Sequence, residues 1–129
     1  MTPRKFLVVG GSEDDRMLYS RTITRKFPDA LVTRINTENA WTLLAHDTEF
    51  AGAVVHFDRT PETAAIVKAL RTAQHDMPII TLSGSPLGPE AKPAGSTAFL
   101  ASGEWLNIGP LLQQHLAGGQ SSGSETLRP

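Results

Sequence analysis

The chain has 129 residues, a formal net charge of −1, 40% hydrophobic residues and no cysteine. This length and composition predict one globular domain, and the small net charge gives no field that would favour nucleic acid or an anionic membrane. Without cysteine, the chain has no disulfide, no thiolate nucleophile and no zinc site of the cysteine type.

The first predicted strand, Lys5 to Val9, is a short apolar run that stops at Gly10 and Gly11. Ser12 follows as an N-cap candidate, and acidic residues fill the first turn of a helix predicted from about Glu13 to Lys26. We expect these acids to stabilise the helix start and not to bind metal. The apolar run is too short for a secretory or membrane-spanning segment, so we expect a cytoplasmic protein with no membrane partner.

The alternating stretch from Ala30 to Ile35 predicts a strand near the edge of a sheet. Thr37 is then a capping candidate for a helix ending near Asp47, whose expected buried stripe is Ala40, Trp41, Leu43 and Leu44. The next strand, within residues 51–58, is a continuous β-branched run, which is typical of a strand buried on both faces of a parallel sheet.

A third helix is predicted from about Pro61 to Ala73, with apolar residues packed inward, among them Ala65, Ile66, Val67 and Leu70. Residues 78–83 form the fourth strand. The stretch 84–95 that follows is rich in proline and glycine, so we expect the fourth helix to be shortened or absent.

A fifth strand is predicted over residues 96–101, followed by a last helix from Gly103 to about Ala117. Pro110 fits inside that helix only if the helix bends or begins near Ile108. If Trp105 is exposed, the last helix is an interface candidate. Residues 1–117 then form the domain, and 118–129 form a flexible tail rich in glycine and serine.

Strands that alternate with helices through short loops predict a three-layer αβα fold around a parallel sheet. At this length we expect the flavodoxin-like arrangement, with five strands in the order 2-1-3-4-5. The ligand crevice of such a sheet lies at the carboxyl ends of strands one and three.

Several segments resemble the receiver domain of two-component response regulators. Residues 6–16 resemble its first strand and turn, 36–44 its second helix, 78–84 its fourth strand and 94–102 its fifth strand. The resemblance extends from Lys5 to Ala117 and implies a signalling domain of the phosphorelay type.

The resemblance also implies a set of chemical groups. A receiver has an acceptor aspartate after strand three, two acids that hold Mg²⁺ after strand one, a hydroxyl after strand four and a lysine after strand five. An aromatic residue on strand five serves as a switch. In this chain the acid pair matches Gly10 and Gly11, and the acceptor matches His56. The hydroxyl, the aromatic residue and the lysine match Ser83, Phe99 and Ser102, respectively.

Glycine has no carboxylate, and hard cations need oxygen ligands, so we expect neither Mg²⁺ nor another cofactor. The sequence therefore predicts a degenerate pseudo-receiver that is not an enzyme, is not phosphorylated on aspartate and acts by binding protein. The partner is expected to be a signalling kinase, a regulator or a second copy of the chain. Its contacts would lie on residues 84–95 and the last helix, or on the first helix in a homodimer.

Two alternatives remain open. The crevice beside Gly10, Gly11, His56 and Ser83 could bind a small ligand or an anion, because a glycine turn before a helix exposes backbone N–H groups. Alternatively, Asp58 could serve as a displaced phosphate acceptor, which is the least favoured reading because this chemistry needs accurate geometry. His56 itself is expected to be hydrogen-bonded, as is usual for a histidine at the end of a strand. The histidines also lack the spacing of metal ligands, so we expect no zinc site.

Overall fold

A parallel sheet forms the middle layer of the computed structural model, which describes residues 4–46, 49–56, 61–83 and 95–125. The strand order is β2-β1-β3-β4-β5, and every neighbouring pair is parallel. The strands are β1 (Lys5–Val9), β2 (Leu31–Ile35), β3 (Gly52–His56), β4 (Ile79–Ser83) and β5 (Ala98–Ala101). The predicted flavodoxin-like fold and its strand order are thus confirmed.

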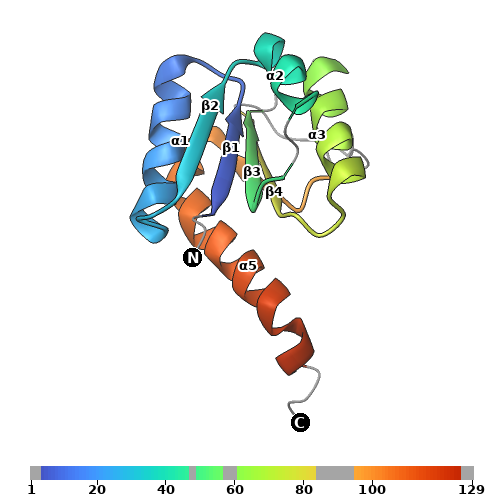
Figure 1. The fold of residues 1–129 in the computed structure, drawn as a ribbon. Helices are drawn as coiled ribbons and strands as arrows, with labels where there is room; N and C mark the ends of the chain where they lie inside the picture. The colour runs from blue at the N-terminus through green and yellow to red at the C-terminus, as the bar shows by residue number, and fades with distance from the viewer. Residues whose placement is uncertain (1–3, 47–48, 57–60, 84–94, 126–129) are drawn as a thin grey trace.

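Helices cover both faces of the sheet. One face carries α1 (Glu13–Lys26) and α5 (Ile108–Glu125), and the other carries α2 (Thr37–Leu44) and α3 (Pro61–Ala73), as Figure 1 shows. A 3-10 helix, η1 (Ser102–Asn107), leads from β5 into α5. The expectation of a short or absent fourth helix falls on residues 84–94, which lie outside the described residues. Within the described part of the chain, no helix has the length and apolarity needed to cross a bilayer.

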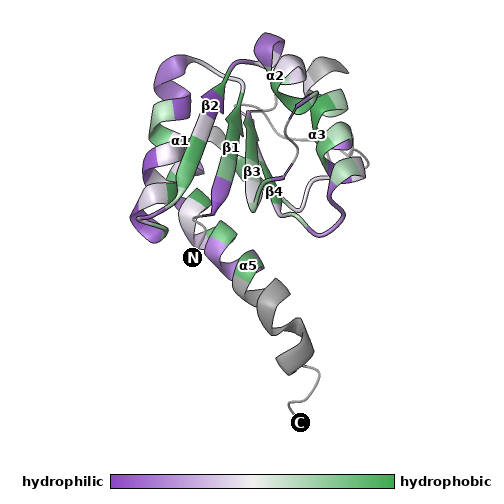
Figure 2. Cartoon of the chain, viewed as in Figure 1, coloured by the Kyte–Doolittle hydropathy of each residue, from purple (hydrophilic) through white to green (hydrophobic). Residues whose placement is uncertain are grey.

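The central strands are apolar throughout because each sends side chains into two separate cores. Leu7 and Val9 of β1 enter the cluster under α2 and α3, whereas Phe6 and Val8 enter the cluster under α1 and α5. Figure 2 shows the resulting contrast between hydrophobic strands and the partly hydrophilic helix α1. Burial on both faces explains why these strands appear in the sequence as continuous apolar runs.

The start of α1 is capped as expected. The Ser12 Oγ accepts from the Asp15 backbone N–H at 3.1 Å, and Asp15 Oδ2 accepts from the Ser12 N–H at 3.1 Å. This reciprocal capping box satisfies two N–H groups that an open helix start would leave unpaired. The carboxylate of Asp15 is therefore used in the cap.

The start of α5 explains how Pro110 fits into the last helix. The α-helix begins at Ile108, so Pro110 lies in its first turn, where a missing N–H costs no intrahelical hydrogen bond. The helix continues past Ala117 to Glu125 and extends beyond the lower edge of the sheet in Figure 1. An established helix propagates more easily than it starts, so it can run into residues of low propensity. The flexible tail over 118–129 stays a prediction.

Two buried positions were predicted wrongly. Trp41 is 43% exposed, and Ala65 is exposed on α3, where the less exposed neighbour is Ala64. In α2 the inward positions are Ala40, Leu43 and Leu44. Helical spacing does not separate a buried residue from its immediate neighbour at the border of the apolar face. Contact with the sheet decides which of the two side chains is buried.

Candidate functional site

The carboxyl ends of β1, β3 and β4 meet at one edge of the sheet, where Gly10 and Gly11 turn the chain into α1. Both glycines have positive φ, +85° at Gly10 and +70° at Gly11. Residues with a Cβ adopt this region rarely, so the tight turn favours glycine. The Gly10 N–H donates to the Ile35 carbonyl at 3.0 Å and ties this turn to the end of β2.

His56, at the end of β3, packs directly against this turn. A Cβ added to Gly11 would lie 3.1 Å from His56 Cγ, and one added to Gly10 would lie 3.1 Å from the His56 carbonyl oxygen. The His56 Nδ1 lies 2.9 Å from the hydroxyl of Tyr19, and the two rings are nearly parallel, 16° apart. The imidazole thus lies against the glycine turn and is hydrogen-bonded to α1.

Tyr19 is the one tyrosine in the chain, so its titration can be followed directly. Burial, aided by the negative charge of Asp15, raises the pKa of Tyr19 from 10.0 to about 12. The folded state then keeps its phenol proton where the unfolded state has lost it, so stability falls as the pH rises from about 10 to about 12. We expect tyrosinate absorbance to have its midpoint near 12 in the native protein and near 10 in urea. A native midpoint near 10 would contradict this burial.

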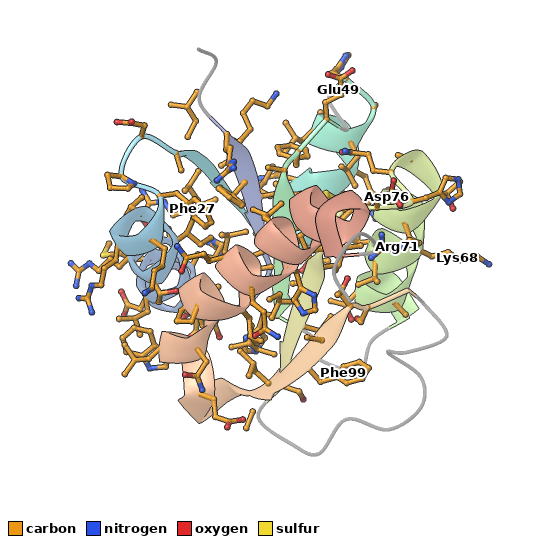
Figure 3. The ribbon with its side chains drawn as sticks, turned by 90° about the horizontal axis from the view of Figure 1, so that it is seen from below. Phe27, Glu49, Lys68, Arg71, Asp76 and Phe99 are labelled. Atoms are coloured by element: carbon orange, nitrogen blue, oxygen red, sulfur yellow. The ribbon has the colours of Figure 1, made fainter. Side chains whose placement is uncertain are left out.

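The remaining predicted positions are spread along the same edge. Ser83 ends β4 and is buried, at 3% exposure. Phe99 on β5 is 40% exposed, and Figure 3 shows its ring at the rim of the molecule. Ser102 is the first residue of η1, and Asp58 lies outside the described residues. The structure therefore brings together Gly10, Gly11, His56 and Ser83 at the ends of adjacent strands, with Phe99 facing outward.

Comparison with solved structures identifies the architecture. A response regulator from Thermotoga maritima superposes with a TM-score of 0.73 at 15% identity, over 91% of this chain and 99% of that one. The chemotaxis response regulator CheY4 of Vibrio cholerae gives 0.66 at 21% identity, over 88% and 99%. The signal receiver domain of NarL from Mycobacterium tuberculosis gives 0.71 at 15% identity, over 92% and 99%.

This chain has the receiver-domain fold. No protein-family model matches the sequence, and a search of curated proteins finds no match, so the similarity rests on structure. At these identities it shows the fold, and the groups in the site must be judged from this chain's own residues.

The described groups at this edge of the sheet (the receiver site, defined by Gly10, Gly11, His56 and Ser83) do not form a binding site for a divalent metal ion. Among the described residues, no group of three His, Cys, Asp or Glu side chains is placed to hold one. Gly10 and Gly11 offer no carboxylate, and the nearby Asp15 carboxylate accepts the Ser12 N–H. A hard cation such as Mg²⁺ is usually bound through carboxylate oxygens, and the described part of this site supplies no carboxylate pair for it.

A cationic side chain of this protein contacts the glycine turn. Arg16 Nη1 donates to the Gly11 carbonyl at 2.6 Å and to the Gly10 carbonyl at 3.3 Å. Neither Arg16 nor the bond from Tyr19 to His56 was predicted from the sequence. Tyr19 lies on the buried face of its helix, and an apolar ring at such a position gives no sign that its hydroxyl has a specific partner. For Arg16, the available signal was a basic residue just after the predicted glycine turn.

Proposed function

We propose that this domain is an atypical, pseudo-receiver signalling domain that is not phosphorylated on aspartate and that acts by binding another protein. The main observation behind this proposal is the position of His56, the residue that matches the acceptor aspartate of a receiver. Its ring lies against Gly11 and its Nδ1 is 2.9 Å from the Tyr19 hydroxyl. An imidazole, a phenol and a guanidinium thus surround a turn where phosphoryl transfer to aspartate would require carboxylates.

The β5 edge surface supports a role in protein binding. We define it as the exposed side chains of Phe99 and Leu106, together with a depression of about 230 Å³ between β5 and α5 that is lined by Leu100, Asn107, Pro110, Leu111 and Gln114. Leu106 is 56% exposed, whereas Trp105 packs partly against the core. Exposed apolar side chains beside a depression are typical of protein-binding surfaces. The proposed partner is a signalling kinase, a regulator or a second copy of the chain. The proposal also includes a cytoplasmic location.

The anion-sensor alternative has less support. Three N–H groups of the glycine turn and helix start already have protein acceptors: Gly10 donates to Ile35, Ser12 to Asp15 and Asp15 to Ser12. An anion would have to displace these bonds and approach the carboxylate of Asp15, which opposes it electrostatically. We therefore favour the protein-binding function.

Incubation with acetyl phosphate and Mg²⁺ tests the phosphorylation part of the proposal. We expect intact-mass spectra of the unaltered protein before and after incubation to be the same, because the carboxylates that promote this transfer are missing at positions 10, 11 and 56. A receiver with a complete acid pair and acceptor aspartate, treated in parallel, serves as the positive control.

A stoichiometric, acid-labile phosphoryl adduct would contradict the proposal. The variant Asp58→Asn would then show whether Asp58 is a displaced acceptor, since its adduct would be lost. An adduct that persists in this variant would direct attention to another carboxylate.

A further inference from the structure

The guanidinium of Arg16 joins the end of β1 to the first turns of α1. A single nitrogen, Nη1, donates to two successive carbonyl oxygens, at 2.6 Å on Gly11 and 3.3 Å on Gly10. The Arg16 side chain is partly buried, and its own backbone N–H donates to the Ser12 carbonyl at 3.0 Å as part of the helix. The cationic group therefore lies over the turn that opens the receiver site.

This position has a specific meaning in a receiver fold. The two residues after strand one are those whose acids would hold Mg²⁺ according to the resemblance, and here they are glycines whose carbonyls point to a guanidinium. A guanidinium is a permanent cation in proteins and, unlike a metal ion, it cannot dissociate from the chain.

The residues around the turn fit one another as a set. A Cβ at Gly11 would meet Asp15 Oδ2 and His56 Cγ, each at 3.1 Å, and one at Gly10 would meet Thr37 Oγ1 at 3.3 Å. Acidic side chains at positions 10 and 11 would thus be crowded by His56, Asp15 and Thr37, and they would also need positive φ. In the arrangement that brings Arg16 onto the carbonyls, an acid pair at positions 10 and 11 would strain the backbone and crowd its neighbours.

We propose that Arg16 is a built-in cation that replaces the divalent metal ion of a receiver site and holds the β1–α1 turn in one conformation whether or not Mg²⁺ is present. This inference rests on the proposed function and adds how the site is regulated. The state of the turn is set by the chain itself, so changes in signalling come from partner binding and not from metal or phosphoryl occupancy.

The test compares the unaltered protein with Arg16→Gln, Arg16→Lys and the matched control Arg21→Gln. Arg21 is an exposed arginine of the same helix whose Nη2 contacts Met17 Sδ at 3.8 Å. Amide NMR signals of residues 10–12 are followed during a titration with MgCl₂, and hydrogen exchange is measured at the Gly10 N–H, which donates to Ile35.

In the unaltered protein we expect no saturable Mg²⁺-dependent shift of these signals. In Arg16→Gln we expect exchange at Gly10 to accelerate by about tenfold or more, because the turn opens locally once its charged donor is lost. Lysine, which keeps the charge but not the planar fork, should restore part of the protection. Arg21→Gln should behave like the unaltered protein.

Saturable Mg²⁺-induced shifts at residues 10–12 of the unaltered protein would overturn the proposal, as would equal exchange rates in Arg16→Gln and Arg21→Gln. The Mg²⁺ titration uses the unaltered protein, so a saturable shift would overturn the proposal even where Arg16→Gln does not fold. A phosphoryl adduct from acetyl phosphate would instead defeat the proposed function. Unchanged exchange without an adduct would defeat the built-in cation alone.

Discussion

Replacing Gly109 by alanine is expected to destabilise the domain by about 3 kcal/mol or more, although alanine is the better helix former by about 1 kcal/mol. The new Cβ would lie 2.3 Å from the Thr22 carbonyl oxygen and 3.0 Å from Lys26 Cγ. The first of these is a backbone atom of α1, so α1 and α5 would have to separate. Separation would also break the buried bond from the Gly109 N–H to Thr22 Oγ1, which is 2.6 Å long.

The measurement is urea unfolding, with the free energy of unfolding compared at equal m-values. Gly103→Ala is the matched control, because a Cβ at Gly103 meets nothing within 4 Å. We expect the control to stay within about 0.5 kcal/mol of the unaltered protein. Equal unfolding midpoints for the two variants would show that α1 and α5 do not approach each other so closely.

The fold was predictable because its signals are local. A strand covered on both faces must be apolar at successive positions, and β1, β3 and β4 carry such runs within a few residues each. The sequence signals for helix starts and ends are local as well. Ser12 therefore indicated the start of α1, and Pro110 limited the positions at which α5 can begin. Once the elements alternate, the chirality and length of the connections leave few possible strand orders.

The chemistry of the site depends on contacts that no local pattern reports. Tyr19 and His56 are 37 residues apart in sequence, and Thr22 and Gly109 are 87 apart. Sequence positions matched to the receiver pattern located Gly10, Gly11 and His56, but not the groups that contact them. Gly109 likewise reads as a weak point in a helix until the packing shows that a larger residue has no room there.

The receiver site and the β5 edge surface are linked through β4 and β5, whose residues pair from Ile80 and Ala98 to Ser83 and Ala101. Arg71 of α3, labelled in Figure 3, fixes the approach to β5 by donating to the Gly95 carbonyl and to Thr97 Oγ1, both at 3.0 Å. The β5 edge surface therefore includes a strand whose preceding residues are fixed by hydrogen bonds from Arg71. A domain whose site is not switched by phosphate would present this surface in a constant form.

The double substitution Phe99→Ser with Leu106→Ser is expected to weaken binding of a protein partner by tenfold or more, about 1.4 kcal/mol or above. The two side chains are 40% and 56% exposed, so their loss removes apolar contact area at the interface with little effect on the core. The partner is first captured with the unaltered domain and identified, and its Kd is then measured for each variant by calorimetry.

Leu31→Ser is the matched control for this double variant, because Leu31 is also 56% exposed but lies on β2, at the opposite edge of the sheet. A loss of affinity in the double variant with unchanged affinity in Leu31→Ser would assign the interface to the β5 edge surface. The reverse pattern would move the interface to β2 and α1, where a homodimer through the first helix would form. Because neither outcome requires a phosphoryl group, the comparison tests the binding surface independently of phosphorylation.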